Sequence, residues 1–275
     1  MNPEAYEQVL KGRYYQAKST NEAVRKAIEC YNQAIAIDER NALAYALLSN
    51  CYRWLADGSF LDPSEARPKA EASARKALEL DEGLAEAHYA LARLNLNAWD
   101  WVGAEQEARR AIEINPNLSR AHSTMAFLLS RLSRHEQAID EARKARELDP
   151  LTAGASINLG YIFYFARQYG QAVEQVKKTM EMDNNLLGHE ILGYTYAAMG
   201  RYNEAIAEYK EHLRLTGDST STQCYLAYAL AKAGKREEAE EIRKTVGDDE
   251  AVCIACGIGS GLYSIRREGT GAIST

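Results

Sequence analysis

The sequence predicts an all-α protein, a right-handed α-solenoid of about seven helix–turn–helix units with a partial eighth at the end. The main observation is an alanine that recurs at intervals of 43, 34, 34, 34, 33 and 34 residues. These alanines are Ala27, Ala70, Ala104, Ala138, Ala172, Ala205 and Ala239. A fixed period near 34 residues indicates one supersecondary unit copied end to end. The composition agrees, because only 5 of 275 residues are proline and good helix formers recur throughout.

A second column of small residues accompanies the alanines. Its members are Gly12, Ser49, Ala92, Ala126, Gly160, Gly193 and Ala227. Each lies 12 residues before its alanine, except in the first two units, which carry insertions. Small residues on facing helices let two backbones approach closely, so we expect the two helices of each unit to pack as an antiparallel pair.

The fourth unit shows both expected helices clearly. Its first helix carries apolar residues at helical spacing, which are Met125, Leu128, Leu129 and Leu132. A second helix opens around residues 134–136, and its apolar stripe consists of Ala138, Ile139, Ala142 and Ala145. Units end in residues that stop a helix and suit the next turn, as at Asn115-Pro116 and Asp149-Pro150. Neither helix can bury its stripe alone, so stacked neighbours must close the core.

The units are expected in one array over residues 1–246, at 5–41, 42–84, 85–118, 119–152, 153–185, 186–219 and 220–246. The second unit carries an insertion, 56–64, whose Asp, Gly, Ser and Pro residues predict a loop with Pro63 at the start of the next helix. This loop is either a tolerated insertion or a contact flap that exposes Phe60 and Leu61. Residues 247–275 are expected to form a degenerate capping helix and a frayed tail, because glycines weaken the helix there.

These columns resemble the tetratricopeptide repeat family. The pattern is clearest in Leu192-Gly193, Tyr196, Gly200-Arg201-Tyr202, Ala205 and Tyr209, and it recurs in Leu159-Gly160, Phe163, Tyr169 and Ala172. The resemblance covers roughly residues 5–246, and seven units agree in phase. One departure is that the first-helix tryptophan of the family is replaced by Tyr45, His88, His122, Ser156, His189 and Gln223. The resemblance implies a scaffold that binds proteins or peptides.

Several segments also resemble a narrower group of bacterial tetratricopeptide arrays. They are 5–15, 25–28, 34–38 and 99–105, the last with the sequence Trp-Asp-Trp-Val-Gly-Ala-Glu. In that group the array is often the C-terminal part of a signalling protein that carries a winged-helix regulator, a nucleotide cyclase or a Ser/Thr kinase. No such effector domain is present in this sequence. The resemblance implies a sensor or adaptor module, either as a fragment of a larger signalling protein or as a stand-alone relative.

A binding groove is the main candidate site. In the family, the first helix of each unit lines the concave face, and the resemblance assigns sixteen residues of this chain to that face. They are Asn50, Arg53, Trp54, Tyr89, Arg93, Asn97, Arg120, Ser123, Phe127, Arg131, Tyr161, Tyr164, Phe165, Glu190, Tyr194 and Tyr228.

The groove residues divide into an N-terminal half rich in arginine and asparagine and an aromatic C-terminal half. Arginine supplies forked donors for carboxylates, and tyrosine and tryptophan are enriched at binding hot spots. A protein or peptide with an acidic part and an apolar part would match this arrangement. The alternative is that part of the aromatic column packs against the adjacent helix. A chaperone-type carboxylate clamp matches poorly, because only Asn50 and some arginines fit its pattern.

No catalytic, cofactor or metal site is predicted, so we do not expect an enzyme. Cys253 and Cys256 form a lone CxxC with no second ligand pair, and a metal or redox role for them ranks behind homo-oligomerisation as an alternative. The glycines at 257–261 lack the strand and spacing of a phosphate-binding loop. Three of the histidines, His88, His122 and His189, occupy one repeat position and are expected to be packing residues.

The composition limits the other functional classes. A net charge of −6 argues against a nucleic-acid binder, which needs a broad cationic surface. The N-terminus lacks the pattern of a secretory signal, and no apolar run is long enough for a membrane span. Five scattered cysteines fit reduced thiols, so we expect a cytoplasmic protein. Homo-oligomerisation through the open C-terminal end is the alternative function, and the sequence leaves the partner unidentified.

Overall fold

The computed structural model describes residues 2–182, 186–217 and 219–246, with only the backbone of Leu186. Within these ranges the chain forms fourteen α-helices and no strand. The all-α helical-repeat fold predicted from the sequence is therefore confirmed. The cysteine pair and the glycines of the expected capping helix, in 247–275, lie outside the described residues.

The helices divide between two compact units, and the chain passes from the first to the second between Asp149 and Pro150. The first unit holds α1 (Pro3–Ala17), α2 (Asn21–Ile37), α3 (Ala42–Asp57), α4 (Pro63–Leu80), α5 (Ala85–Asn97), α6 (Trp101–Ile114), α7 (Ser119–Arg131) and α8 (His135–Leu148). The second holds α9 (Ala153–Phe165), α10 (Tyr169–Met182), α11 (Leu186–Ala198), α12 (Tyr202–Thr216), α13 (Thr220–Lys232) and α14 (Arg236–Val246).

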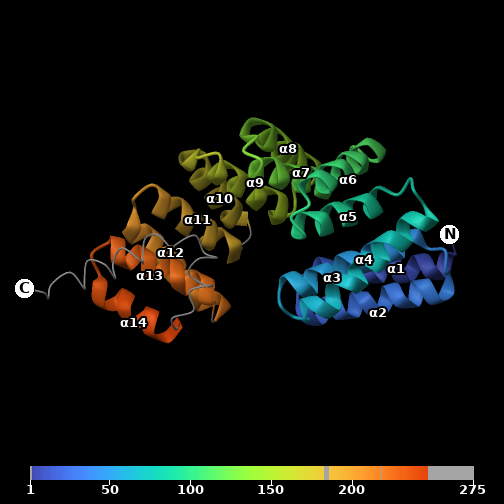
Figure 1. Cartoon of the computed structure of the whole chain (residues 1–275), viewed down its shortest axis with the longest axis horizontal. Coiled ribbons are helices and arrows are strands. Elements are labelled where there is room, and N and C mark those ends of the chain that lie inside the picture. The colour runs from blue at the N-terminus through green and yellow to red at the C-terminus, as the bar shows by residue number, and fades with distance from the viewer. Residues whose placement is uncertain (1, 183–185, 218, 247–275) are drawn as a thin grey trace, which may run out of the picture. The chain divides into compact units, whose positions relative to one another are not determined.

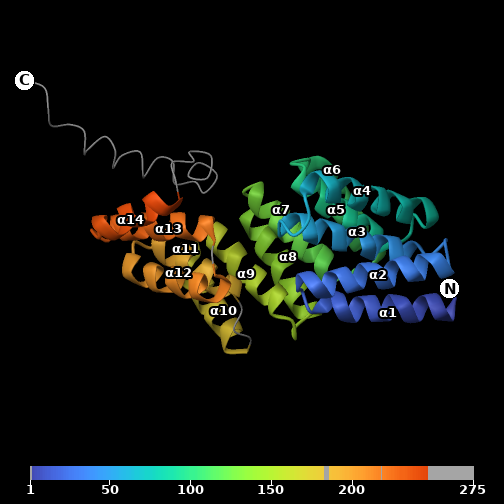
Figure 2. The same cartoon turned by 90° about the horizontal axis from the view of Figure 1, so that it is seen from below.

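Consecutive helices pair within each unit. In the first unit α1 packs on α2 and α3 on α4, which Figures 1 and 2 both show, and the pairs α5–α6 and α7–α8 follow. In the second unit the pairs are α9–α10, α11–α12 and α13–α14. The first helix of one pair also contacts the first helix of the next, from α3 to α5 to α7 and from α9 to α11 to α13. Side chains from several pairs therefore share one face within each unit.

Local sequence explains where the helices begin. Side chains of Thr20, Asn41, Asp62 and Asp100 accept hydrogen bonds from backbone N–H groups of the helices that follow them. Pro63 is the first residue of α4, as the sequence predicted, because its missing N–H would have no partner there.

The turn inside each pair needs a left-handed residue. Trp99, Ser133, Arg167, Gly200 and Gly234 all have positive φ, between 58° and 83°, and each lies two residues before the second helix of its pair. Their spacing repeats the period of the alanines. Glycine adopts this conformation without steric penalty, whereas the other side chains are held there by the surrounding turn.

The core of each pair is formed by small residues of the first helix packing against the second helix. All seven alanines that set the period are buried. A Cβ atom at Gly193 would collide with the ring of Tyr209, and one at Gly12 would collide with the ring of Tyr31. The sequence had predicted small residues facing small residues, but the glycines instead leave room for a large side chain on the second helix.

Histidine and glutamate join the two helices in three pairs. The Nδ1 atoms of His88, His122 and His189 lie 2.6, 2.6 and 2.7 Å from carboxylate oxygens of Glu107, Glu141 and Glu208, each 19 residues further on. Nε2 of His122 also lies 2.9 Å from the carbonyl oxygen of Pro116, so both ring nitrogens face acceptors. These histidines are therefore packing residues with a charged partner.

The insertion in the second pair lengthens its helices. Only residues 58–62 separate α3 from α4, whereas the sequence predicted a loop over 56–64. Phe60 is 43% exposed, but its ring stacks on Trp54 with centroids 5.1 Å apart, and Leu61 packs against the core. The main-chain oxygen of Phe60 accepts a hydrogen bond from Arg25. These contacts fix the loop against its own unit.

Replacing Gly193 with alanine should destabilise the fold. The added Cβ would collide with the Tyr209 ring, and such overpacking costs about 1–3 kcal/mol. Gly154→Ala is the matched control, because nothing lies within 4 Å of a Cβ at that helical position and the change should stabilise by up to about 1 kcal/mol. Urea unfolding followed by circular dichroism measures both variants. Equal midpoints for the two would contradict the close helix contact.

The His122–Glu141 pair should make stability depend on pH. The hydrogen bond to Glu141 raises the pKa of His122 above its ordinary 6.5, against the opposing effect of burial. Because the folded-state pKa is the higher one, the pair's contribution is complete below about pH 6.5 and is lost as pH rises through the folded pKa. Unfolding measured across this window should show the loss in the native chain and a shallower slope in Glu141→Gln. An identical slope in both would contradict the role of this pair.

Candidate functional site

Three first helices of the N-terminal unit bring four of the predicted groove residues together. Arg53 lies on α3, Tyr89 and Arg93 on α5, and Arg120 at the start of α7. Contacts join α3 to α5 and α5 to α7, and the three guanidinium groups lower the pKa of the Tyr89 hydroxyl. We call Arg53, Tyr89, Arg93 and Arg120 the basic surface.

The charges of the basic surface act on the pKa of Tyr89. Burial raises the pKa of this hydroxyl, but Arg53, Arg93 and Arg120 outweigh burial and bring the pKa below its usual value. The pKa of Arg93 is lowered too, first because its guanidinium is buried and then because Arg53 repels it. Both shifts indicate that an anion placed here would be attracted.

One carboxylate partly balances this charge. Asp57, in the last turn of α3, pairs with Arg53 and also accepts a hydrogen bond of 2.7 Å from Nδ2 of Asn97. The predicted groove residues Arg53 and Asn97 are thus brought together through Asp57, which the sequence had not indicated. A further ion pair joins Arg13 to Glu86, with a nitrogen–oxygen distance of 3.5 Å.

Two predicted groove residues of this unit make contacts inside the fold instead. Asn50 is buried, and its Nδ2 donates to the carbonyl oxygen of Ala46 one turn earlier. Trp54 is half-buried beneath Phe60. Neither residue is as exposed as Arg120.

The remaining predicted residues of this unit lie along α7. Arg131 is exposed, and its guanidinium lies 4.9 Å from the ring centroid of the half-buried Phe127. Ser123 is half-buried one turn before Phe127. Ser123, Phe127 and Arg131 follow Arg120 at intervals of one helical turn, on the same side of α7.

The C-terminal unit contains a continuous group of aromatic rings. Tyr161 contacts Phe165 with ring centroids 4.6 Å apart, Tyr164 contacts Tyr194 at 6.0 Å, and Tyr194 contacts Tyr225 at 4.7 Å. These five rings are half-buried and come from α9, α11 and α13. We call this group the aromatic ladder. Its rings pack on one another and also keep part of their surface accessible, so it combines the two alternatives that the sequence left open.

Polar groups hold the ladder in place. The hydroxyl of Tyr194 donates to the carboxylate of Glu190 one turn earlier, and burial, followed by Glu190, raises the pKa of Tyr194. Tyr228 is half-buried on α13, with the ammonium of Lys232 5.7 Å from its ring centroid. The ladder therefore carries aromatic surface with a neutral hydroxyl and little charge.

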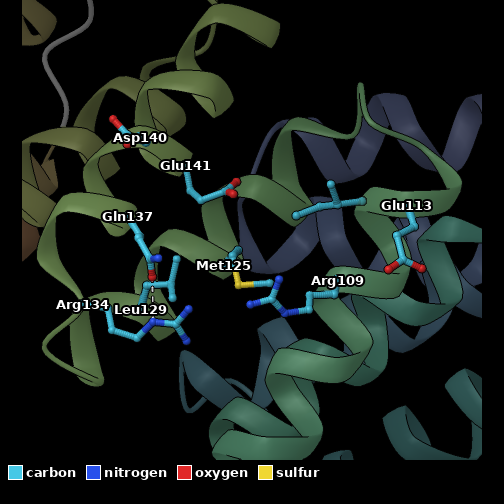
Figure 3. Close-up of a pocket in the computed structure, with 9 residues that line it drawn as sticks. Arg109, Glu113, Met125, Leu129, Arg134, Gln137, Asp140 and Glu141 are labelled. Carbon is cyan, nitrogen blue, oxygen red and sulfur yellow. Dashed lines mark hydrogen bonds between the residues drawn. The ribbon is translucent and has the colours of Figure 1, made fainter.

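A separate hollow of about 330 Å³ lies between α6, α7 and α8 (Figure 3). Its apolar lining comes from Ile112, Met125 and Leu129. Most of the charged groups around it pair with other residues: Arg109 and Arg134 both bind Glu105, Glu113 binds Arg110, and Glu141 binds His122. Because these charges are already compensated, the hollow offers weaker recognition than the basic surface.

The described residues contain no cluster of His, Cys, Asp and Glu side chains able to hold a metal ion. Burial raises the pKa of the Cys51 thiol to about 12, which makes it unreactive. Cys253 and Cys256 lie outside the described residues, so their chemistry stays a prediction. Among the described helices, none combines the length and hydropathy that a membrane span requires.

Sequence reasoning missed the residues that complete these groups. Asp57 and Tyr225 stand outside the repeat positions from which the groove was predicted, and Glu86, 34 residues before Arg120, was not singled out. A signal was present for the His–Glu pairs, because a glutamate follows each of the three histidines by the same 19 residues.

A comparison with protein families matches residues 189–218, which hold most of α11 and all of α12, to the tetratricopeptide repeat. No curated protein sequence is similar enough to this chain to count as a relative.

Solved structures of tetratricopeptide proteins share the fold. A tetratricopeptide repeat protein from Parabacteroides merdae has a TM-score of 0.61 at 16% identity, over 94% of this chain and 100% of its own. TTC0263 from Thermus thermophilus has a TM-score of 0.57 at 19% identity, over 66% and 99%. A chain of the APC/C hetero-tetramer Cut9-Hcn1 has a TM-score of 0.66 at 15% identity, over 82% of this chain but only 43% of its own.

Replacing Arg93 with methionine should stabilise the protein. The change keeps an unbranched apolar stem and removes a buried guanidinium that Arg53 repels, so we expect a gain of about 1 kcal/mol. Arg67→Met, at an exposed position of α4, should change stability by less than about 0.5 kcal/mol. Urea unfolding compares the two variants with the native chain. A clear loss of stability in Arg93→Met would mean that the guanidinium supports the fold itself.

Proposed function

We propose that this chain, a tetratricopeptide-repeat protein, binds segments of partner proteins on the faces formed by the first helices of its pairs. Folds of this class are commonly scaffolds for protein–protein interaction. The observation that carries the proposal is the basic surface, where three arginines and a buried tyrosine meet with too little negative charge to balance them. Unbalanced positive charge beside buried side chains is more typical of a ligand-binding site than of a packed core.

The partner segment that fits has an acidic part and an apolar part. The acidic part matches the guanidinium groups of Arg93 and Arg120, which offer forked donors. The apolar part matches the aromatic ladder, whose rings are rigid and amphipathic. Each surface lies within its own compact unit, so the two can be tested separately.

The cellular role we infer is that of a sensor or adaptor module in a bacterial signalling system. This inference rests on the resemblance of segments 5–15, 25–28, 34–38 and 99–105 to arrays that accompany effector domains. A scaffold role needs no catalytic group. The alternative of homo-oligomerisation through residues 247–275 concerns a segment outside the described residues, and light scattering across a concentration series separates it from partner binding.

Two groove variants and one control test the proposal. Arg93→Ala with Arg131→Ala removes charge from the first unit, and Tyr161→Leu with Tyr194→Leu removes rings from the second while keeping apolar volume. Lys76→Ala with Arg110→Ala alters exposed residues of α4 and α6 and serves as the control. Circular dichroism confirms that each variant is folded.

Proteins captured by the native chain should bind at least about tenfold more weakly to one or both groove variants, because hot-spot side chains contribute more than 1 kcal/mol each. The control should retain them. Titration of an identified partner by calorimetry gives the affinities. Unchanged binding by both groove variants, or a loss confined to the control, would place the interaction elsewhere on the molecule.

A further inference from the structure

The charges around the basic surface leave two arginines unbalanced. Arg53 pairs with Asp57, and Arg13 pairs with Glu86. Within the part of the chain that the structure describes, the guanidinium groups of Arg93 and Arg120 make no ion pair or hydrogen bond. The positive charges of Arg53, Arg93 and Arg120 act more strongly on the Tyr89 hydroxyl than the carboxylate of Asp57 does. The surface therefore carries about two uncompensated positive charges.

Donor groups inside the surface are also unsatisfied. The Nε atoms of Arg53 and Arg93 are buried, and within the described part of the chain neither has a hydrogen-bond partner. The Tyr89 hydroxyl, on a residue only 8% exposed, has none there either. A buried donor without an acceptor costs about 1–3 kcal/mol. Two such donors on the contacting helices α3 and α5 indicate a ligand that brings several acceptor oxygens.

The guanidinium groups lie close enough together to repel. Arg53 acts directly on Arg93, and both act on the same tyrosine hydroxyl. A carboxylate brings one charge and two oxygens, which would neutralise half of the excess. A phosphate monoester brings a charge of about −1.5 to −2 and three acceptor oxygens on one phosphorus atom. Arginine is suited to this group, because its fork matches phosphate geometry in a bidentate manner.

From this geometry we infer that the basic surface binds the phosphoryl group of a phosphorylated side chain in the partner protein. This inference rests on the proposed function, since it specifies the acidic part of the partner segment. Arg93 and Arg120 neutralise the phosphoryl charge, and the Nε groups of Arg53 and Arg93 donate to its oxygens. The hydroxyl of Tyr89 donates to a third oxygen. Asp57 stays bound to Arg53 and Asn97 and fixes the position of Arg53.

Binding of the isolated group can be measured by NMR on the full chain. The buried Nε–H groups of Arg53 and Arg93 provide the signals, and the probes are inorganic phosphate, O-phosphoserine, acetate and succinate at constant ionic strength. Saturable shifts with phosphate and O-phosphoserine, with affinity at least about tenfold above that for acetate and succinate, are expected. Equal affinity for the carboxylates, or shifts that never saturate, would overturn the inference.

Variants assign the binding to these residues. Arg93→Gln and Arg120→Gln should each weaken binding of O-phosphoserine at least about tenfold, whereas Arg67→Gln on the exposed face of α4 should not change it. Arg120 is itself exposed, so its variant keeps the test valid if Arg93→Gln is poorly folded. The assignment would be contradicted if both variants are folded and both still bind O-phosphoserine as tightly as the native chain does.

Phosphatase treatment separates this inference from the proposed function. Partners that bind the native chain and require Arg93 should be lost when the partner is dephosphorylated. If they still bind fully, the scaffold role stands and the phosphoryl inference fails. If the groove variants of both units still bind every partner, the scaffold role on these faces fails as well.

Discussion

The rest of the structure depends on one contact. In each pair, a small residue of the first helix packs against the second helix. Gly193 and Gly12 leave space that the rings of Tyr209 and Tyr31 fill, and a buried alanine recurs on the second helix of every described pair. This contact fixes the rotation of each first helix about its axis. Side chains at equivalent repeat positions then point to one face, which is why Arg53, Arg93 and Arg120 meet although they are far apart in sequence.

The basic surface differs from the rest of the fold in its energetics. Elsewhere charged side chains pair along helices, as Lys26 does with Glu22, or between helices, as His122 does with Glu141. At the basic surface the guanidinium of Arg93 is buried beside another positive charge, which opposes folding. A buried, repelled guanidinium of this kind fits a site where a ligand supplies the missing negative charge. Binding of that ligand then stabilises the folded protein.

The helix pairs could be predicted from the sequence because the repeat period and the size of each side chain can be seen directly in it. The sequence also assigned Arg53, Arg93 and Arg120 to one face. It did not predict the balance of charge on that face, because Asp57 reaches Arg53 and Asn97 through side-chain geometry that no repeat position encodes. The insertion was predicted as a loop from its composition, but helix packing extended α3 and α4 into it. The left-handed residues Ser133 and Arg167 were missed because neither type favours that conformation.

Site-specific photocrosslinking tests the central claim most directly, which is that partners bind on the faces of the first helices. A photoreactive phenylalanine at Phe127 would lie on α7 in line with Arg120, and one at Gln106 would lie exposed on the second helix α6. The account predicts that a captured partner is crosslinked from position 127 and not from position 106. Crosslinking from position 106 alone would contradict it.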